Sequence, residues 1–249
     1  MQLSFKYNDI LYSFNTSLPL DISLGVRHDG LGTNCFYTDR PLFKSYQAGS
    51  FIGNVAKGGA CNVDVISFTP HGNGTHTECI GHITAEQQSI TEALHQGLMM
   101  ARLITVIPEQ IGDNLVITKN LIVPIDSNNS LEAIIVRTRP NDSSKKTMDY
   151  SGKNPAYFAP EVLQYFKEKG IKHLLCDIPS VDREDDGGKL LAHKAFFGVP
   201  ESPRMDATIT ELIYVDDSIE NGLYMLDIQI ASFQSDASPS RPLLYRLKL

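Results

Sequence analysis

The chain has 249 residues, 42% of them hydrophobic and 20% charged, which is long enough to bury a sizeable core. The net charge of −7, without a basic patch, argues against a nucleic-acid partner and against a membrane surface. No apolar run reaches the roughly 18 residues of a transmembrane helix, and the N-terminus lacks the apolar core of a signal peptide. We therefore expect one globular domain over residues 1–249.

The four cysteines, Cys35, Cys61, Cys79 and Cys176, show no CxxC spacing. Metal-binding or redox-active cysteine pairs usually have that spacing, and a disulfide framework would need a secreted context. The cysteine pattern therefore predicts reduced thiols in a cytoplasmic protein.

The N-terminal quarter of the chain contains two predicted features. Residues 2–14 alternate apolar and polar side chains around Asn8 and Asp9, which predicts a β-hairpin. Residues 19–60 are rich in Gly, Asp, Asn and Pro, which predicts a long loop region. For the aromatic residues of this loop we keep two interpretations, a minor packed cluster and a lid over a functional site. These residues are Phe36, Tyr37, Phe43 and Tyr46.

Residues 69–82 hold three of the seven histidines of the chain and directly follow a strand-like run at 61–68. His76 and Glu78 are two residues apart, so on an extended chain both side chains point to the same face. His71 has the wrong parity for that strand and meets them only if the chain bends. Gly72-Asn73-Gly74 provides residues that adopt such a bend easily.

Two imidazoles and a carboxylate are ligands for zinc, manganese or iron, whereas calcium prefers a cage of oxygen atoms. Three protein ligands leave one coordination position open, as catalytic sites do. The alternative interpretation is a polar turn with solvent-exposed histidines. Cys79 is a further candidate ligand or nucleophile, but its odd parity relative to Glu78 turns its side chain away. The motif predicts a catalytic metal site.

The middle of the chain alternates predicted strands with short polar segments. Ser89–Glu92 fits a capping box that opens a short helix, with His95 as a surface histidine. Residues 98–107 and 133–138 are predicted strands that end before Pro108 and Pro140. The polar residues 141–153 are a predicted surface loop.

The last hundred residues favour an α/β or α+β domain with mixed sheets. Residues 160–169 predict a helix that buries Val162, Leu163 and Phe166, and a strand follows at 171–176. Residues 182–188 are acidic and glycine-rich without the EF-hand spacing, so we expect a solvated loop and no calcium site. The remaining predictions are a short helix opened by His193, a strand at 208–215 that carries Glu211, and strands at 223–233 and 242–248.

The segment Gly74-Thr75-His76-Thr77-Glu78, followed three residues later by His82, resembles the signature of the metal-dependent cyclase family. This family includes bacterial kynurenine formamidase and isatin hydrolase. Later segments resemble further blocks of the family in the same order: residues 177–182, 191–194 and 209–212, and a closing Ser-Pro-x-Arg turn at 238–241. The resemblance implies a swivelling β/β/α domain with a mixed, barrel-like sheet and few flanking helices.

Three features depart from the formamidase pattern. Glu78 stands where the formamidases carry Asp, so its carboxylate reaches one methylene further. Ile80 replaces a proline that usually stiffens the loop. The chain has no tryptophan, although the formamidases place aromatic residues near the pocket, which argues against a kynurenine-type substrate more than against the chemistry.

The resemblance also implies the site. His71, His76 and Glu78 bind a first metal ion, and Glu78 bridges to a second ion that His193 and Glu211 complete. His82 is the catalytic acid/base group. The expected cofactor is Zn²⁺, with one or two ions per chain, and Mn²⁺ is the alternative.

The implied activity is hydrolysis of a small-molecule amide, formamide or lactam by a metal-bound hydroxide, in a homodimer or larger homo-oligomer. Two alternatives keep the same scaffold: a metal-binding protein without turnover, and a hydrolase of cyclic esters or other small carbonyl compounds. A serine hydrolase is disfavoured because the chain has no Gly-x-Ser-x-Gly elbow.

Overall fold

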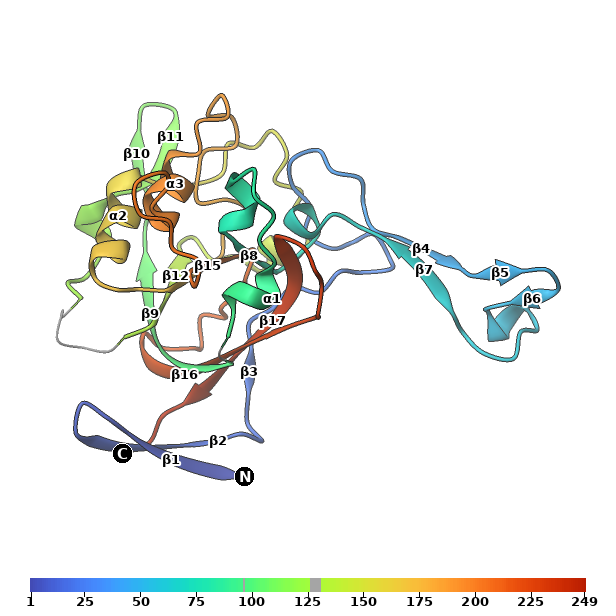
Figure 1. Cartoon of the computed structure of the whole chain (residues 1–249), viewed down its shortest axis with the longest axis horizontal. Helices are drawn as coiled ribbons and strands as arrows, with labels where there is room; N and C mark the ends of the chain where they lie inside the picture. The colour runs from blue at the N-terminus through green and yellow to red at the C-terminus, as the bar shows by residue number, and fades with distance from the viewer. Residues whose placement is uncertain (96, 126–130) are drawn as a thin grey trace.

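Seven strands form a closed, barrel-like sheet in the computed structural model, which describes residues 1–95, 97–125 and 131–249 (Figure 1). β3 (Leu20–Asp21) extends the sheet by pairing with β17. The prediction of a mixed, barrel-like α/β fold is therefore confirmed. The order around the barrel is β16 (Gly222–Ile230), β9 (Leu98–Val106), β12 (Ala133–Thr138), β14 (His173–Cys176), β15 (Thr208–Glu211), β8 (His76–Cys79) and β17 (Ala237–Arg246), which pairs back with β16.

The sheet is mixed because two of its connections contain crossover helices. The pairs β9–β12, β12–β14 and β14–β15 are parallel. The helix α2 (Pro160–Glu168) lies between β12 and β14, and α3 (Leu191–Phe197) lies between β14 and β15. β8 then pairs antiparallel with β15, in a register that sets Glu211 opposite His76. This register places the end of β15 next to the start of β8, although the two strands are more than a hundred residues apart in the sequence.

Two hydrophobic clusters pack on opposite faces of the barrel strands. On β12, Ile134 and Val136 belong to one cluster, and Ala133 and Ile135 belong to the other. The larger cluster includes the side chains that α2 and α3 bury. On α2 these are the predicted residues, Val162, Leu163 and Phe166.

Short elements surround the barrel, and several were predicted. The N-terminal hairpin joins β1 (Gln2–Tyr7) to β2 (Ile10–Asn15) through Asn8 and Asp9, both with positive φ. The Ser89 hydroxyl accepts a hydrogen bond from the backbone N–H of Thr91 at the start of α1 (Ile90–Ala93). The other small elements are the sheet of β10 (Glu109–Ile111), β11 (Asn114–Ile117) and β13 (Tyr157–Phe158) and the 3-10 helices η1 (Val55–Lys57), η2 (Pro70–Gly72), η3 (Ile80–Ile83), η4 (Lys119–Leu121) and η5 (Ser143–Thr147).

A two-stranded ribbon, residues 42–67, projects far from the barrel and is called the arm below (Figure 1). The predicted loop over 19–60 is therefore wrong for its second half. The polar and glycine-rich composition of this segment reflects the exposure of most of the ribbon, because neither of its faces packs on a core. The strands are β4 (Leu42–Ser45), which pairs with β7 (Asp64–Ser67), and β5 (Gln47–Ala48), which pairs with β6 (Phe51–Ile52).

Two other predicted segments differ from the structure. The Ser-Pro-x-Arg segment at 238–241 lies inside β17 and is not a turn, and its Arg241 binds Asp21 across the β17–β3 pair. The loop 141–153 is not only solvated, because Lys145 reaches inward to the buried carboxylate of Asp177 at 2.9 Å. No helix in the described ranges has the length and apolar character of a membrane span.

Candidate metal centre

A sharp bend before β8 brings His71 back onto the strand that carries His76 and Glu78. Gly74 has φ +119°, and a Cβ atom there would lie 2.6 Å from the carbonyl oxygen of Leu24, so only glycine fits. The bend places His71 Nδ1 3.1 Å from Glu78 Oε2. The predicted bend and the predicted strand parity of His76 and Glu78 are both present.

β15 and α3 bring the two distant residues to the same place. Glu211 ends β15, and its Oε2 lies 3.4 Å from His76 Nε2. His193 lies in the first turn of α3, with its Nε2 3.0 Å from Glu78 Oε1 and 4.0 Å from Glu211 Oε1. Five of the six sequence-predicted side chains therefore converge from three elements and the bend before β8.

His82 is the sixth member and lies at the edge of this group, on η3. Its ring stacks on His71 with the centroids 4.1 Å apart, and its Nε2 lies 3.8 Å from Glu78 Oε2. The His82 side chain is 30% exposed, whereas those of His76 and His193 are almost fully buried. These six residues are called the cluster below: His71, His76, Glu78, His82, His193 and Glu211.

An acceptor outside the cluster holds the outer ring nitrogen of each of three histidines. His76 Nδ1 lies 3.1 Å from the Gly74 carbonyl oxygen, His193 Nδ1 lies 2.6 Å from Asp182, and His71 Nε2 lies 2.8 Å from Asp236. Such contacts fix the ring so that the other nitrogen faces inward, as the second shell of a metal site does.

Asp182 and Asp236 were not predicted as site residues. Asp182 is buried and accepts hydrogen bonds from the backbone N–H groups of Ala192 and His193, so it caps the start of α3. The prediction of a solvated loop is wrong at this position. Asp236 lies between His71 and His82, with its Oδ2 3.4 Å from His82 Nδ1. No periodicity or spacing in the sequence marks either aspartate.

The inward-facing atoms of the cluster have no hydrogen-bond partner outside it. Within the described residues, His76 Nε2, His193 Nε2 and both carboxylate oxygens of Glu78 are buried, and their nearest polar neighbours are other atoms of the cluster at 3.0–3.4 Å. An unpaired buried polar atom is costly, typically about 1–3 kcal/mol. Four of them converging at one point are explained if a cation binds all of them, so the donor set fits a metal ion.

The charges in the cluster agree with this interpretation. Burial opposes ionisation of Glu78, but the positive charges of His82 and His193 outweigh burial and hold its pKa well below the usual value. Burial likewise opposes protonation of His193, but the charge of Glu78 and the hydrogen bond to Asp182 raise its pKa to about 10. Without a metal ion, protons supply the positive charge that the buried carboxylate requires.

By their mutual distances, the possible metal-ligand atoms fall into overlapping sets. One atom from each of His71, His76 and Glu78 lies within 4.8 Å of the other two, and the same holds for Glu78, His82 and His193. Glu78 belongs to both sets. The same distance also joins the side chains of His71, His82 and Asp236.

Cys79, a candidate ligand or nucleophile, and His95, a predicted surface histidine, both lie away from these sets of ligand atoms. The Cys79 thiol faces the other side of β8 and hydrogen-bonds to the Gln88 carbonyl oxygen, and burial raises its pKa to about 11. His95 is exposed just after α1. Of the aromatic residues at 36–46, Phe36 packs in a small cluster with Cys35 and Tyr150, while Tyr46 lies on the arm against Phe51.

Comparison with known proteins identifies the family. The family model described as "Putative cyclase" matches residues 10–183. A kynurenine formamidase from Bacillus cytotoxicus is 23% identical over 188 residues, covering 75% of this chain and 81% of that protein. A predicted metal-dependent hydrolase from Bacillus stearothermophilus has a TM-score of 0.60 at 18% identity, covering 92% of this chain and 98% of that one. Isatin hydrolase A from Labrenzia aggregata has a TM-score of 0.61 at 13% identity, covering 92% and 93%. The family match spans most of the chain, which therefore belongs to the putative cyclase family.

Proposed function

We propose that the protein is a metal-dependent hydrolase that cleaves an amide, a formamide or a cyclic amide. The observation that carries this proposal is the convergence of four buried ligand atoms from His76, Glu78 and His193 that have no hydrogen-bond partner outside the cluster. A protein that only needed a stable barrel would gain by replacing such a group with apolar side chains of similar volume.

The cluster offers ligands for two ions. His71, His76 and Glu78 would hold the first, and Glu78, His193 and Glu211 the second, which makes Glu78 the shared ligand. Imidazole and carboxylate donors suit Zn²⁺, with Mn²⁺ as the alternative. When bound, a divalent cation supplies Lewis acidity, polarising a carbonyl oxygen and lowering the pKa of a coordinated water from about 15.7 toward 7. The two carboxylates contribute −2, so two dications leave a net +2 in the cluster.

His82 is the proposed acid/base group. An amide nitrogen leaves as an amine only when it receives a proton, so the site needs a proton donor close to the reacting carbon. His82 Nε2 faces the cluster at 3.8 Å from Glu78, and Asp236 lies on the Nδ1 side of the ring. The partial exposure of His82 lets it exchange protons with solvent between turnovers, which buried His76 cannot do.

The relatives support the choice of bond. Kynurenine formamidase and isatin hydrolase are named for a formamide and a lactam, and both bonds join a carbonyl carbon to nitrogen. The missing tryptophan argues against the formamidase substrate itself. Cyclic esters and a metal-binding role without turnover are the competing possibilities.

Metal analysis combined with a hydrolysis panel tests the proposal. The purified protein should contain zinc or manganese, and amide hydrolysis should disappear with a chelator and return when the metal is restored. Bound metal without hydrolysis of any amide or cyclic ester would favour the metal-binding role. Turnover that survives complete metal removal would contradict the proposal.

We also propose a cytoplasmic homo-oligomer in which a second copy covers the arm. The arm exposes seven large apolar side chains, and an isolated two-stranded ribbon is marginally stable in water. Two lysines and one aspartate give the arm a net charge of +1, which leaves −8 on the rest of the −7 chain and favours contact with the body of a second copy. Four free cysteines fit a reducing compartment. The exposed apolar residues of the arm are Leu42, Tyr46, Phe51, Val55, Val63, Val65 and Ile66.

A further inference from the structure

The two exposed side chains of the cluster, His71 at 22% and His82 at 30%, both contact Asp236. The side chains of Glu78, His76 and His193 are 0–2% exposed, whereas those of His82 and Asp236 are 30% and 34% exposed. A substrate must therefore approach past His82 and Asp236. The chemistry of the surface around these two residues decides which molecules reach the cluster.

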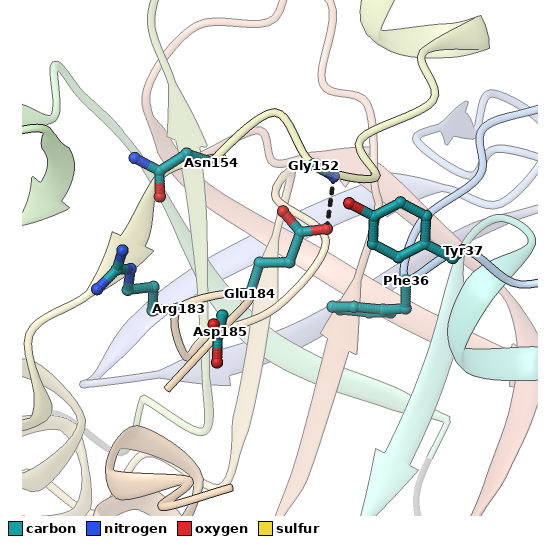
Figure 2. A pocket seen from close by; sticks show the side chains of 7 residues that line it. All are labelled: Phe36, Tyr37, Gly152, Asn154, Arg183, Glu184 and Asp185. Carbon is teal, nitrogen blue, oxygen red and sulfur yellow. Dashed lines mark hydrogen bonds between the residues drawn. The ribbon is translucent and has the colours of Figure 1, made fainter. Parts of the chain in front are cut away.

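A cavity of about 540 Å³ contains both residues in its wall. It lies between η3, the segment before α1 and the segment before β17. The larger cavity beside the acidic loop is a different space, because its lining includes no residue of the cluster (Figure 2). That lining consists of Phe36, Tyr37, Gly152, Asn154 and residues 183–185. The cavity beside His82 is lined by Gly81, His82, Gln87, Gln88, Ser89, Glu92, Gln234, Ser235 and Asp236.

The lining of the cavity beside His82 is polar throughout. It contains three primary amides, two hydroxyl groups and two carboxylates, and it has no aliphatic, aromatic or basic side chain apart from His82. The side chains of Gln87, Gln88 and Glu92 make no hydrogen bond within the described residues, so they are available to a ligand. Glu92 and Asp236 add negative charge and have no arginine or lysine beside them in the cavity.

We propose that the substrate is a small, non-aromatic amide that carries several hydrogen-bonding groups and no net negative charge. The inference rests on the proposed hydrolase function and narrows its substrate class. An aromatic ring in this cavity would offer no hydrogen-bonding group to the glutamine amides, and the exposed side chains of Gln87 and Gln234 would bind water instead. A cyclic ureide or imide instead offers alternating N–H and C=O groups, which match the donors and acceptors of primary amides. A substrate carboxylate that bound beside Glu92, on the side of the cavity away from the cluster, would have no arginine or lysine as a partner in the lining.

The reaction needs no co-reactant except water. One water molecule adds across the acyl C–N bond, so the carbonyl carbon gains OH and the nitrogen gains H when the bond breaks. His82 carries the proton to the leaving nitrogen, as proposed above. Ring opening leaves the new carboxyl group and the released nitrogen in one molecule, as an amine for a lactam, a ureido group for a cyclic ureide and a primary amide for an imide.

The test compares two substrate classes on metal-loaded protein. Hydantoin and dihydrouracil represent the polar cyclic amides, and isatin and N-formylkynurenine represent the aryl amides. We expect kcat/KM for at least one polar compound to exceed that of both aryl compounds by about tenfold or more. Q87L and Q234L should raise KM for the polar substrate by about tenfold, with kcat and bound metal little changed. Q110L, an exposed glutamine on β10 in a different sheet, is the matched control.

Two outcomes separate the failure of this inference from the failure of the proposed function. Faster hydrolysis of the aryl class, unaffected by Q87L and Q234L, would overturn the substrate class and leave the hydrolase function intact. Hydrolysis of neither class would count against the function. Calorimetry on the metal-loaded H82A protein then measures substrate binding without turnover. Tighter binding of the polar cyclic amides than of the aryl amides supports the inference, and equal or weaker binding overturns it.

Discussion

The metal centre and the arm are both incomplete in a single copy of the chain, but they lack different things. In the centre, buried polar atoms of His76, Glu78 and His193 have no hydrogen-bond partner outside the cluster within the described residues. In the arm, apolar side chains such as Val65 and Ile66 lie about half exposed on opposite faces of one strand. Unpaired polar atoms require a charged ligand, whereas uncovered apolar surface requires another apolar surface. The two proposals therefore differ in kind: a metal ion for the centre and a second copy of the chain for the arm.

Glu78→Gln should have the largest effect, because it removes the charge that both proposed ion sites share. The amide keeps the size of the side chain, so the barrel should fold. We expect loss of at least one metal ion per chain and a fall in kcat/KM of about 10³-fold or more, checked by elemental analysis and steady-state kinetics. E161Q on the exposed face of α2 should change neither quantity. Full metal content with normal activity in E78Q would contradict the assignment of Glu78 as a ligand.

His82→Ala should separate catalysis from metal binding within the centre. Removal of a positioned acid/base group lowers kcat by about 10²–10⁴-fold, whereas the ligands remain in place. The measurement is kcat together with metal content in the same preparation, and H95A is the matched control because His95 is exposed just after α1. If H82A loses its metal, His82 is itself a ligand and the assignment of roles changes.

Lysine substitutions in the arm should break the assembly without affecting the centre. A double variant, V65K and I66K, places charge on both faces of β7, which should weaken self-association by at least about 30-fold. Light scattering after gel filtration should then show the mass of one chain, with metal content unchanged. I107K places the same charge at an exposed apolar position outside the arm and should leave the mass as in the unmodified protein. An unmodified protein that is already monomeric would argue against the proposed assembly.

Asp182→Asn should produce a smaller effect, because it acts through His193. The amide oxygen still accepts a hydrogen bond, but the charge that orients the His193 ring is lost. Second-shell changes of this kind usually weaken metal binding by about 10–100-fold, which a competition titration with a coloured chelator measures. D185N, exposed in the same loop, is the control. Equal affinities in D182N and the unmodified protein would show that Asp182 serves only to cap α3.

The local part of the centre could be predicted from sequence, because parity and bend propensity are short-range properties. His76 and Glu78 do share a strand, and Gly74 does need a positive φ. His193 and Glu211 could not be placed in this way, since their position depends on the β8–β15 pairing across more than a hundred residues. Only the family resemblance joined them to the motif.

Other features gave no readable signal. Residues 42–60 of the arm are rich in glycine and resembled a loop, whereas β7 lies within the strand-like run at 61–68. Asp236 lies two residues before a segment that resembled a turn and is in fact a strand. Its role comes from the fold, which places it against His71 and His82.

The prediction with the smallest expected effect concerns His173. This histidine is buried like His193, but the carboxylates of the metal centre do not surround it. Burial and the charge of Lys172 lower its pKa from 6.5 to about 4, whereas the carboxylates around His193 raise the pKa there to about 10. A depressed folded-state pKa means that His173 contributes its full stability above pH 6.5 and loses it as the pH falls toward 4. The loss amounts to at most about 3 kcal/mol of unfolding free energy.

H173Q removes this titration and keeps a side chain that can hydrogen-bond Thr208. Urea unfolding of the metal-free proteins between pH 7 and 4 should show a shallower decline for H173Q than for the unmodified chain, and the two curves should converge as the pH falls. The residues of the cluster titrate equally in both proteins, so the difference isolates His173. Parallel curves would show that burial does not keep the His173 imidazole neutral. The difference in pKa between His173 and His193 could then not be attributed to the carboxylates of the metal centre.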